Sequence, residues 1–367
     1  MIGKIVNRIT DEASLLLSFI KNYKKVKNLA KLSVLADENI RNYSTEICPI
    51  CMSSEMEMLA RFPINIPRGQ NHSLLYFDYE KNDIDLLKTK KEIMDKSMGF
   101  FVSITWNFCS NCKNGSLSTQ FKSDHLIRYY SDFYKRGKKL TNLRRNTKEL
   151  HGRYLSSLLT PRSNVLEIGA ADGITAEYLA RQGHKIYVYE PSKQFSELLK
   201  KSTLIVYVDD YKSFAGTMDA IYLHHVLEHI PDPVNYIRGL QPLLLKNGIL
   251  FIQVPDLSLQ CGIIEKAVKR SICALFNKPY FDFKKFNCLK TLRGNASHWF
   301  DALANDHINA FTYEGLKYVV TEAGFYCETL IQSLKDRITY DTTKYAWPVD
   351  EETGSPPNGL TVIAKKR

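Results

Sequence analysis

Apolar and polar positions change their pattern near residue 164 of this chain. After that point short apolar runs alternate with amphipathic segments, which predicts buried strands joined by helices in a parallel sheet. We expect strands at NVLEIG, KIYVYEP, LIVYVDD, MDAIYLHH and ILFIQVPD, then at Tyr326 to Ser333 and at NGLTVIAKK. Helices are expected at ITAEYLARQG and VNYIRGLQPLLLKNG. The pattern indicates an α/β fold.

Residues 1–44 differ from the rest, because Lys and Arg outnumber the acids there and apolar residues recur at helical spacing. We expect a basic helical leader that packs on the body of the protein or on a second copy in a homodimer. Contact with a membrane surface is the alternative, which the short apolar face disfavours. No apolar run reaches the roughly 20 residues of a spanning helix, and no long signal core is present. We therefore expect a cytoplasmic protein.

The composition is that of a globular protein, and its charge narrows the choice of partner. Of 367 residues, 44% are hydrophobic and 24% are charged, which excludes a disordered tail. This length favours two domains over one. The formal charge of +11 favours an anionic partner, such as a phosphorylated metabolite, a nucleic acid or an acidic lipid surface.

Four of the eight cysteines stand in two CxxC pairs, CPIC and CSNC. A CxxC turn brings two thiolates to one ion at about 2.3 Å, so two such turns complete a tetrahedral zinc site. The ligands would be Cys48, Cys51, Cys109 and Cys112. Four cysteines leave no open coordination position, so the zinc would be structural. The pairs are too far apart for a compact zinc ribbon, and a small domain must fold between them.

The first expected strand leads through a small-residue turn, GAADG, into a helix. Such a turn lets the backbone approach a ligand at the helix N-terminus. The second strand ends in Glu190, about where a Rossmann-like site places an acid on ribose hydroxyls. A nicotinamide cofactor fits less well, because GAADGI does not match the GxGxxG fingerprint.

The segment EIGAADG together with Glu190 resembles motif I and the following acidic motif of class I S-adenosylmethionine-dependent methyltransferases. In this chain Ala171 replaces the middle glycine. The resemblance implies a Rossmann-like sheet of seven strands with helices on both faces, over residues 151–367, and S-adenosylmethionine as cofactor. The residues implied to bind it are Glu167, Gly169, Ala171, Gly173, Glu190, Asp209, Asp210, His224 and Tyr130.

The N-terminal half resembles the small zinc-binding domain of sugar C-methyltransferases that act on nucleotide-linked keto-deoxysugars. The resemblance rests on ICPICMSSEMEMLARFPINIP, ITWNFCSNCKNGSLS and the aromatic YYSDFYKRGKKL. It implies a zinc-binding domain over residues 45–125 and a connector over residues 126–150. Those enzymes carry a further C-terminal Rossmann-like domain, whereas here the expected sheet ends with the chain. The resemblance therefore supports a sugar substrate class more than C-methylation itself.

Three histidines and a glutamate gather in HHVLEH, at the end of the fourth expected strand. Ligands of parallel sheets lie beyond the carboxyl ends of the strands, and in this fold that loop faces the transferring methyl group. His224 and His225 would point to opposite faces if the strand continued, so we expect only His225 to reach the site. Glu228 and His229 resemble the Glu-His pair of many small-molecule methyltransferases, with His229 as general base. Packing, capping and helix-dipole roles are the alternatives.

Residues 257–305 are expected to form a lid over the acceptor, because the segment is too long for a plain connection. The lid leads to His307, a second candidate for catalysis or substrate contact. Tyr130 and its aromatic neighbours would close over the methionine end of the cofactor or pack between domains. A divalent ion held by Glu228, His229 and His307 is a further alternative.

These features lead to one main hypothesis and two alternatives. We expect in-line methyl transfer to a sugar hydroxyl or carbon of a nucleotide-linked, surface-glycan or secondary-metabolite intermediate. An RNA base methyltransferase with a zinc module would fit the charge. However, the Asn/Asp-Pro-Pro-aromatic motif of base-amine methyltransferases and a clustered arginine patch are missing. A non-catalytic binding subunit is disfavoured by the intact Gly169, Gly173 and Glu190.

Overall fold

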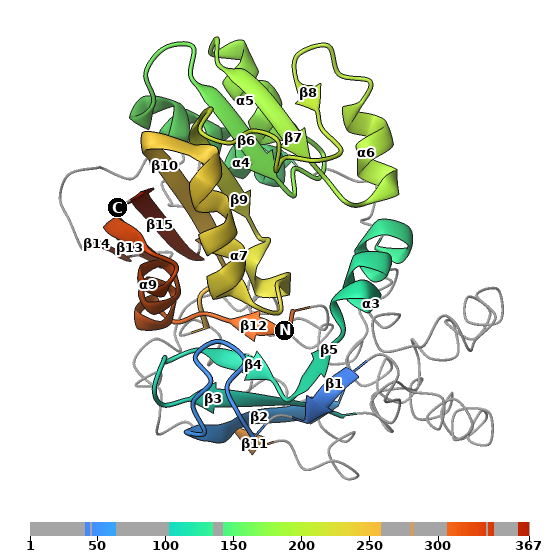
Figure 1. Ribbon diagram of the computed structural model, residues 1–367, viewed down its shortest axis with the longest axis vertical. Coiled ribbons are helices and arrows are strands. Elements are labelled where there is room, and N and C mark those ends of the chain that lie inside the picture. Colours follow the sequence, from blue (N-terminus) through green and yellow to red (C-terminus); the bar gives the residue numbers. More distant parts are fainter. Residues whose placement is uncertain are drawn as a thin grey trace, which may run out of the picture.

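The computed structural model describes residues 41–44, 46–63, 103–134, 142–257, 280–281, 307–334, 337–340 and 359–366. They form a large mixed sheet with helices and a smaller antiparallel unit beside it (Figure 1). Most of the expected leader and of the expected lid lies outside the described residues. No helix in the described part of the chain is both long and apolar enough to cross a bilayer.

The large sheet has the order β14-β13-β15-β10-β9-β6-β7-β8. Its parallel strands are β6 (Asn164–Ile168), β7 (Lys185–Tyr189), β8 (Val206–Tyr207), β9 (Met218–His224) and β10 (Leu244–Val254). β15 (Gly359–Lys366) runs antiparallel between β10 and β13 (Phe325–Leu334). All seven expected strands are therefore confirmed. The expected total of seven is one too low, because the short β14 (Arg337–Tyr340) folds back on β13 as an added edge strand.

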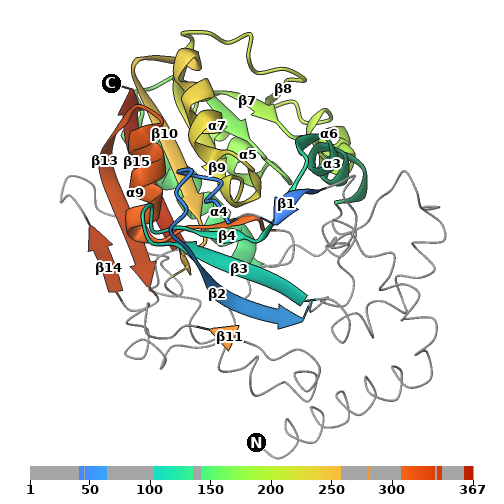
Figure 2. The same cartoon turned by 60° about the horizontal axis from the view of Figure 1, so that its bottom comes forward.

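Helices cover both faces of this sheet (Figure 2). On one face α4 (Asn142–Leu158) and α5 (Ile174–Arg181) pack with the Val165 side of β6. On the other face α7 (Pro233–Leu240) and α9 (Tyr313–Glu322) pack with the Leu166 side. Burial on both faces explains why these strands are continuous apolar runs in the sequence.

Two predicted boundaries differ from the structure. The helix expected at VNYIRGLQPLLLKNG ends at Leu240, and after a 3-10 turn at Gln241–Leu243 the chain already enters β10 at Leu244. Pro242 in this turn has no amide hydrogen to continue the helix. In addition, α4 crosses residue 150, where we expected the connector to end.

The smaller unit is built around β2 (Met56–Pro63), β3 (Ser103–Cys109) and β4 (Gly115–Leu117). β3 has the sequence SITWNFC and ends at the first cysteine of the second pair. Two strands from much later in the chain complete its sheet: β11 (Tyr280–Phe281) pairs with β2, and β12 (Asn309–Ala310) pairs with β4. The unit is therefore joined by backbone hydrogen bonds to segments that follow β10.

A second pair of strands lies beside this unit. β1 (Arg41–Ser44) pairs with β5 (Thr119–Phe121), so the end of the expected helical leader is a strand. After β5 the chain forms α3 (Ser123–Arg128) and a π-helical turn at Tyr129–Phe133, which brings Tyr130 toward the large sheet.

Candidate functional site

The GAADG turn between β6 and α5 has an unusual backbone conformation, which leaves main-chain atoms accessible at the start of α5. Gly169, Ala171 and Gly173 have φ angles of 75°, 50° and 71°, all in the left-handed region. A Cβ on Gly169 would lie 2.5 Å from Val226 Cγ2, and one on Gly173 would lie 2.6 Å from Leu199 Cδ2. Both positions therefore require glycine for conformation and for space.

Glu190 lies just after β7 and braces this turn. Its Oε2 accepts a hydrogen bond from the Ala171 amide at 2.8 Å, and its Oε1 accepts one from the Ser192 amide at 2.9 Å. The carboxylate is thus buried beside the turn, at the carboxyl end of the second strand. This is the place expected for an acid that contacts ribose hydroxyls.

Glu167 lies inside β6 and is 3% exposed. Burial raises the pKa of its carboxyl to about 8, although the nearby Lys148 opposes the shift. Its Oε2 has no hydrogen-bond partner among the described residues. A buried carboxyl of this kind is suited to a cationic ligand group, which would restore its charged form.

Lys148 is a site residue that sequence analysis missed. It lies on α4, is buried, and forms an ion pair with Asp172 of the GAADG turn. Its carbonyl oxygen also accepts a hydrogen bond from Thr175 Oγ1 at 3.2 Å. Nothing in the sequence distinguishes it from the other basic residues of LRRNTKELHGR. Only the packing of α4 against α5 shows that this lysine faces the turn.

The two aspartates expected near the adenine follow the very short β8. Asp209 is exposed and pairs with Lys200 at 3.4 Å. The Asp210 Oδ1 atom accepts a hydrogen bond from the Lys212 amide at 2.9 Å. Both lie at the carboxyl edge of the sheet, and their role toward an adenine ring stays a prediction.

His224 and His225 were expected to point to opposite faces if the strand continued, and that condition is not met. β9 ends at His224, and His225 adopts a left-handed φ of 56°, which breaks the alternation of a strand. The two rings are therefore neighbours, with centroids 4.5 Å apart. His224 also lies edge-on to His151 at 4.7 Å.

Glu228 is buried in the loop after β9, where it is surrounded by histidines. Its Oε1 lies 3.0 Å from His225 Nδ1 and 3.9 Å from His307 Nε2. Burial raises the pKa of this carboxyl, but the hydrogen bond and charge of His225, with the charges of His229 and His307, lower it to about 2. The structure thus brings His307, from a distant segment, to the same carboxylate as the nearby His225.

His229 and Tyr130 are in direct contact. The Tyr130 hydroxyl lies 2.7 Å from His229 Nδ1, and the rings of His229 and His307 are 4.7 Å apart. Tyr130, which we expected over the cofactor, therefore orients the expected general base. One ligand atom each of Glu228, His229 and His307 lies within 4.8 Å of the others, so this cluster has the composition of a divalent metal site as well.

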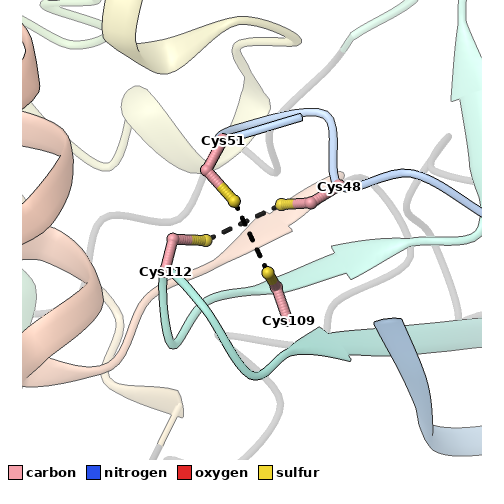
Figure 3. A group of neighbouring side chains, drawn as sticks. All are labelled: Cys48, Cys51, Cys109 and Cys112. Carbon is pink, nitrogen blue, oxygen red and sulfur yellow. Dashed lines mark hydrogen bonds between the residues drawn. The ribbon is translucent and has the colours of Figure 1, made fainter. Parts of the chain in front are cut away.

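The four cysteines of the two CxxC pairs converge on one point (Figure 3). Cys48 Sγ lies 3.6 Å from Cys112 Sγ, and Cys51 Sγ lies 3.5 Å from Cys109 Sγ. These distances are far above a disulfide bond of about 2.05 Å, and close to the edge of about 3.8 Å that a tetrahedron of sulfurs has around zinc.

The two cysteine turns also have the same backbone geometry. The amides of Met52 and Lys113 donate to the carbonyls of Cys48 and Cys109 at 2.9 and 3.0 Å. Met52 and Lys113 have φ angles of 59° and 60°. Two matching turns with left-handed residues after the second cysteine fit a shared tetrahedral ion.

Comparisons with known proteins agree with the fold of the large sheet. The family described as "Methyltransferase domain" matches residues 138–330. The ubiquinone biosynthesis O-methyltransferase of Vibrio campbellii is 25% identical over 132 residues, which cover 33% of this chain and 56% of that protein. The enzyme of the same name from Xanthomonas axonopodis pv. citri is 30% identical over 110 residues, 27% of this chain and 46% of its own length. The chain thus spans about half the length of these curated relatives.

Solved structures of similar proteins give a more distant likeness. The structure of a putative S-adenosylmethionine dependent methyltransferase from Listeria monocytogenes covers 60% of this chain and 98% of its own, with 15% identity and a TM-score of 0.39.

Proposed function

Because this chain belongs to the methyltransferase domain family, we propose that it transfers the methyl group of S-adenosylmethionine to a small-molecule acceptor. The observation that carries the proposal is the bond from the Ala171 amide to Glu190, which joins the glycine turn to the acid expected on the ribose. When bound, the cofactor supplies an electrophilic methyl group on a sulfonium.

The charges around the turn support this cofactor. Asp172 and Glu190 are close enough to raise the pKa of Glu167, and Lys148, which pairs with Asp172, opposes that shift. S-Adenosylmethionine carries an ammonium and a sulfonium, which suit the carboxylates, and a carboxylate, which suits Lys148. We assign the ammonium to Glu167 and the ribose to Glu190.

His229 is our candidate for the general base. Its Nδ1 is bonded to the Tyr130 hydroxyl, so we assign proton uptake from the acceptor to Nε2. The acceptor oxygen or carbon then forms a bond to the methyl carbon as the carbon–sulfur bond breaks, leaving S-adenosylhomocysteine. His225 and His307 would keep Glu228 charged beside this base.

We propose a sugar hydroxyl or carbon as the methylated position, in an anionic intermediate carried on a phosphate group. The sequence resemblance of the N-terminal half and the formal charge of +11 support this substrate class. The same resemblance and the converging cysteines support a structural zinc ion. The ubiquinone biosynthesis O-methyltransferases from Vibrio campbellii and Xanthomonas axonopodis pv. citri, in contrast, align with only 33% and 27% of this chain.

A metal-assisted reaction is the second candidate. The observation in its favour is that Glu228 Oε2 is buried without a hydrogen-bond partner among the described residues, next to His229 and His307. A divalent ion on these three ligands would bind the acceptor oxygen and lower its pKa.

The first experiment is a calorimetric titration of the zinc-loaded protein with S-adenosylhomocysteine. We expect micromolar binding by the wild type and at least about tenfold weaker binding by Glu190→Gln, because an amide cannot accept from two N–H groups and the ribose. Glu197→Gln, at an exposed position for which no cofactor contact is expected, is the control and should bind as the wild type does. A well-folded wild type that does not bind would overturn the proposed function.

A further inference from the structure

We propose that the four-cysteine unit is part of the frame of the active site, with Asn114 as the residue that positions the segment starting at His307. This inference rests on the proposed function and assigns its zinc-binding unit a task beyond stability. It follows from how that segment is held on two sides.

One side of the segment is held by the cysteine unit. After the turn at Cys112 the chain enters β4, which pairs with β12 so that Ser116 lies opposite Asn309. The Leu117 amide donates to the Ile308 carbonyl at 2.8 Å. The residues that follow His307 are therefore a strand of the cysteine unit's own sheet.

The other side is held by the loop after β9. The Ile308 amide donates to the Glu228 carbonyl at 2.9 Å. Asn309 Nδ2 donates to the Ile230 carbonyl at 2.6 Å. His307 thus reaches Glu228 and His229 because the next two residues connect the four-cysteine unit to the loop after β9.

Asn114 extends this connection to α9. Its side chain is 1% exposed, and Nδ2 donates to the Gly315 carbonyl at 3.0 Å and to Cys112 Sγ at 3.7 Å. A Cβ on Gly315 would lie 1.8 Å from Asn114 Oδ1, so the two residues are in direct contact.

Lys113, the residue before Asn114, forms a second hydrogen bond between the cysteine turn and the start of α9. The Lys113 carbonyl accepts from Thr312 Oγ1 at 2.6 Å, and the same hydroxyl oxygen accepts from the Gly315 amide to cap α9. The second cysteine turn therefore fixes the start of α9, while β4 fixes residues 308–310. Both ends of the His307 segment depend on the conformation of one zinc-binding turn.

The chain offers a matched control in the same turn. Asn111 Nδ2 donates to Cys51 Sγ at 3.6 Å, much as Asn114 donates to Cys112 Sγ. Asn111 is exposed, however, and within the described residues its side chain does not reach α9. The two asparagines share a sulfur contact and differ in the contact with Gly315.

The test compares full-length, zinc-loaded wild type, Asn114→Ala and Asn111→Ala by hydrogen exchange, zinc content and titration with S-adenosylhomocysteine. For Asn114→Ala we expect about tenfold faster exchange in residues 307–316, with zinc content and affinity within about twofold of the wild type because the cofactor turn is untouched. Asn111→Ala should match the wild type in all three. Unchanged exchange in Asn114→Ala would overturn the proposal.

One further variant and zinc chelation test the same connection independently of Asn114→Ala. Thr312→Val removes the bond to Lys113 and should loosen the same residues if Asn114→Ala fails to fold. Chelation of zinc from the wild type should also raise exchange in residues 307–316, and full protection after chelation would contradict the proposal. Loss of S-adenosylhomocysteine binding by the wild type would instead count against the proposed function, because the exchange result does not depend on it.

Discussion

The amide of Ala171 and the carboxylate of Glu190 are 2.8 Å apart, so the turn after β6 and the end of β7 share a hydrogen bond across the carboxyl edge of the sheet. The turn residues are held in left-handed conformations that an unbraced loop would populate only partly. A site built in advance loses less entropy when a ligand binds. This pair of residues therefore determines how well the turn is prepared for a cofactor.

Cofactor affinity should depend on pH through Glu167. Burial raises the pKa of this carboxyl to about 8, so in the folded protein it is mostly protonated at neutral pH. An ammonium group bound beside it favours the charged form, and binding then releases a proton. We expect the dissociation constant for S-adenosylhomocysteine to fall from pH 6 to 8, by at most about tenfold per pH unit. Calorimetry in two buffers of different ionisation enthalpy measures the proton release.

Glu167→Gln is the control for this pH dependence. It should bind less tightly at pH 8 and show no slope. The raised pKa of Glu167 also makes the free energy of unfolding depend on pH, because the folded state binds the proton more tightly than the unfolded state. The stabilisation from this protonation is complete below about pH 4.5 and is lost as the pH rises through 8. A wild-type affinity that stays flat between pH 6 and 8 would refute the role of Glu167.

Metal analysis should find one tightly bound zinc per chain at the cysteines. Cobalt(II) in its place should give the strong sulfur-to-metal charge-transfer bands of a tetrahedral all-sulfur site. Cys109→Ser should lose these bands together with the ion. A protein that contains no metal after purification in the presence of zinc would contradict the assignment.

The same cobalt titration separates the two candidate mechanisms. A second equivalent that adds only weak absorption, and that is lost in His307→Ala, would show an ion at Glu228, His229 and His307. Saturation at one equivalent would leave His229 as a base without metal assistance.

Gly315→Ala should destabilise the protein, because its Cβ would lie 1.8 Å from Asn114 Oδ1 in a fully packed region. We expect a loss of about 1–3 kcal/mol in the free energy of unfolding, the usual range for overpacking. Gly239→Ala in the exposed part of α7 meets nothing within 4 Å and should instead add about 0.5–1 kcal/mol. Urea denaturation of both variants checks the difference in sign.

Tyr130→Phe should change the state of His229 without changing cofactor affinity. The variant keeps the ring but removes the hydroxyl that lies 2.7 Å from His229 Nδ1. We expect a shift of the His229 side-chain nitrogen signals in NMR spectra, and a dissociation constant for S-adenosylhomocysteine within about twofold of the wild type. Tyr134→Phe, in a neighbouring ring of the same cluster, is the control. Unchanged His229 signals in Tyr130→Phe would refute the positioning role.

The parts of the site that could be predicted from sequence are those in which each residue is determined by its neighbours along the chain. Gly169 and Gly173 have conformations and contacts that allow no side chain, and such a requirement leaves a readable pattern. The seven expected strands could be read because both faces of the sheet are buried. The paired cysteines could be read because each pair lies in one tight turn, and such a turn fixes the spacing of its two cysteines.

The parts that could not be predicted depend on contacts between distant segments. Lys148 looks like any other surface lysine until α4 packs against α5. The meeting of His307 with Glu228 depends on the pairing of β12 with β4, which no local pattern encodes. The contact between the His224 and His225 rings could not be predicted, because β9 ends before a left-handed residue that the sequence does not mark.

The position of β15 between β10 and β13 has a consequence for how the protein is made. On the ribosome β10 and β13 are synthesised well before Gly359–Lys366, yet they are not neighbours and meet only through that strand. Until it emerges, both strands present unpaired edges, which are sites of wrong association between nascent chains. The large sheet therefore closes late in synthesis, and a chain stalled before residue 359 would leave the edges of β10 and β13 open to other chains.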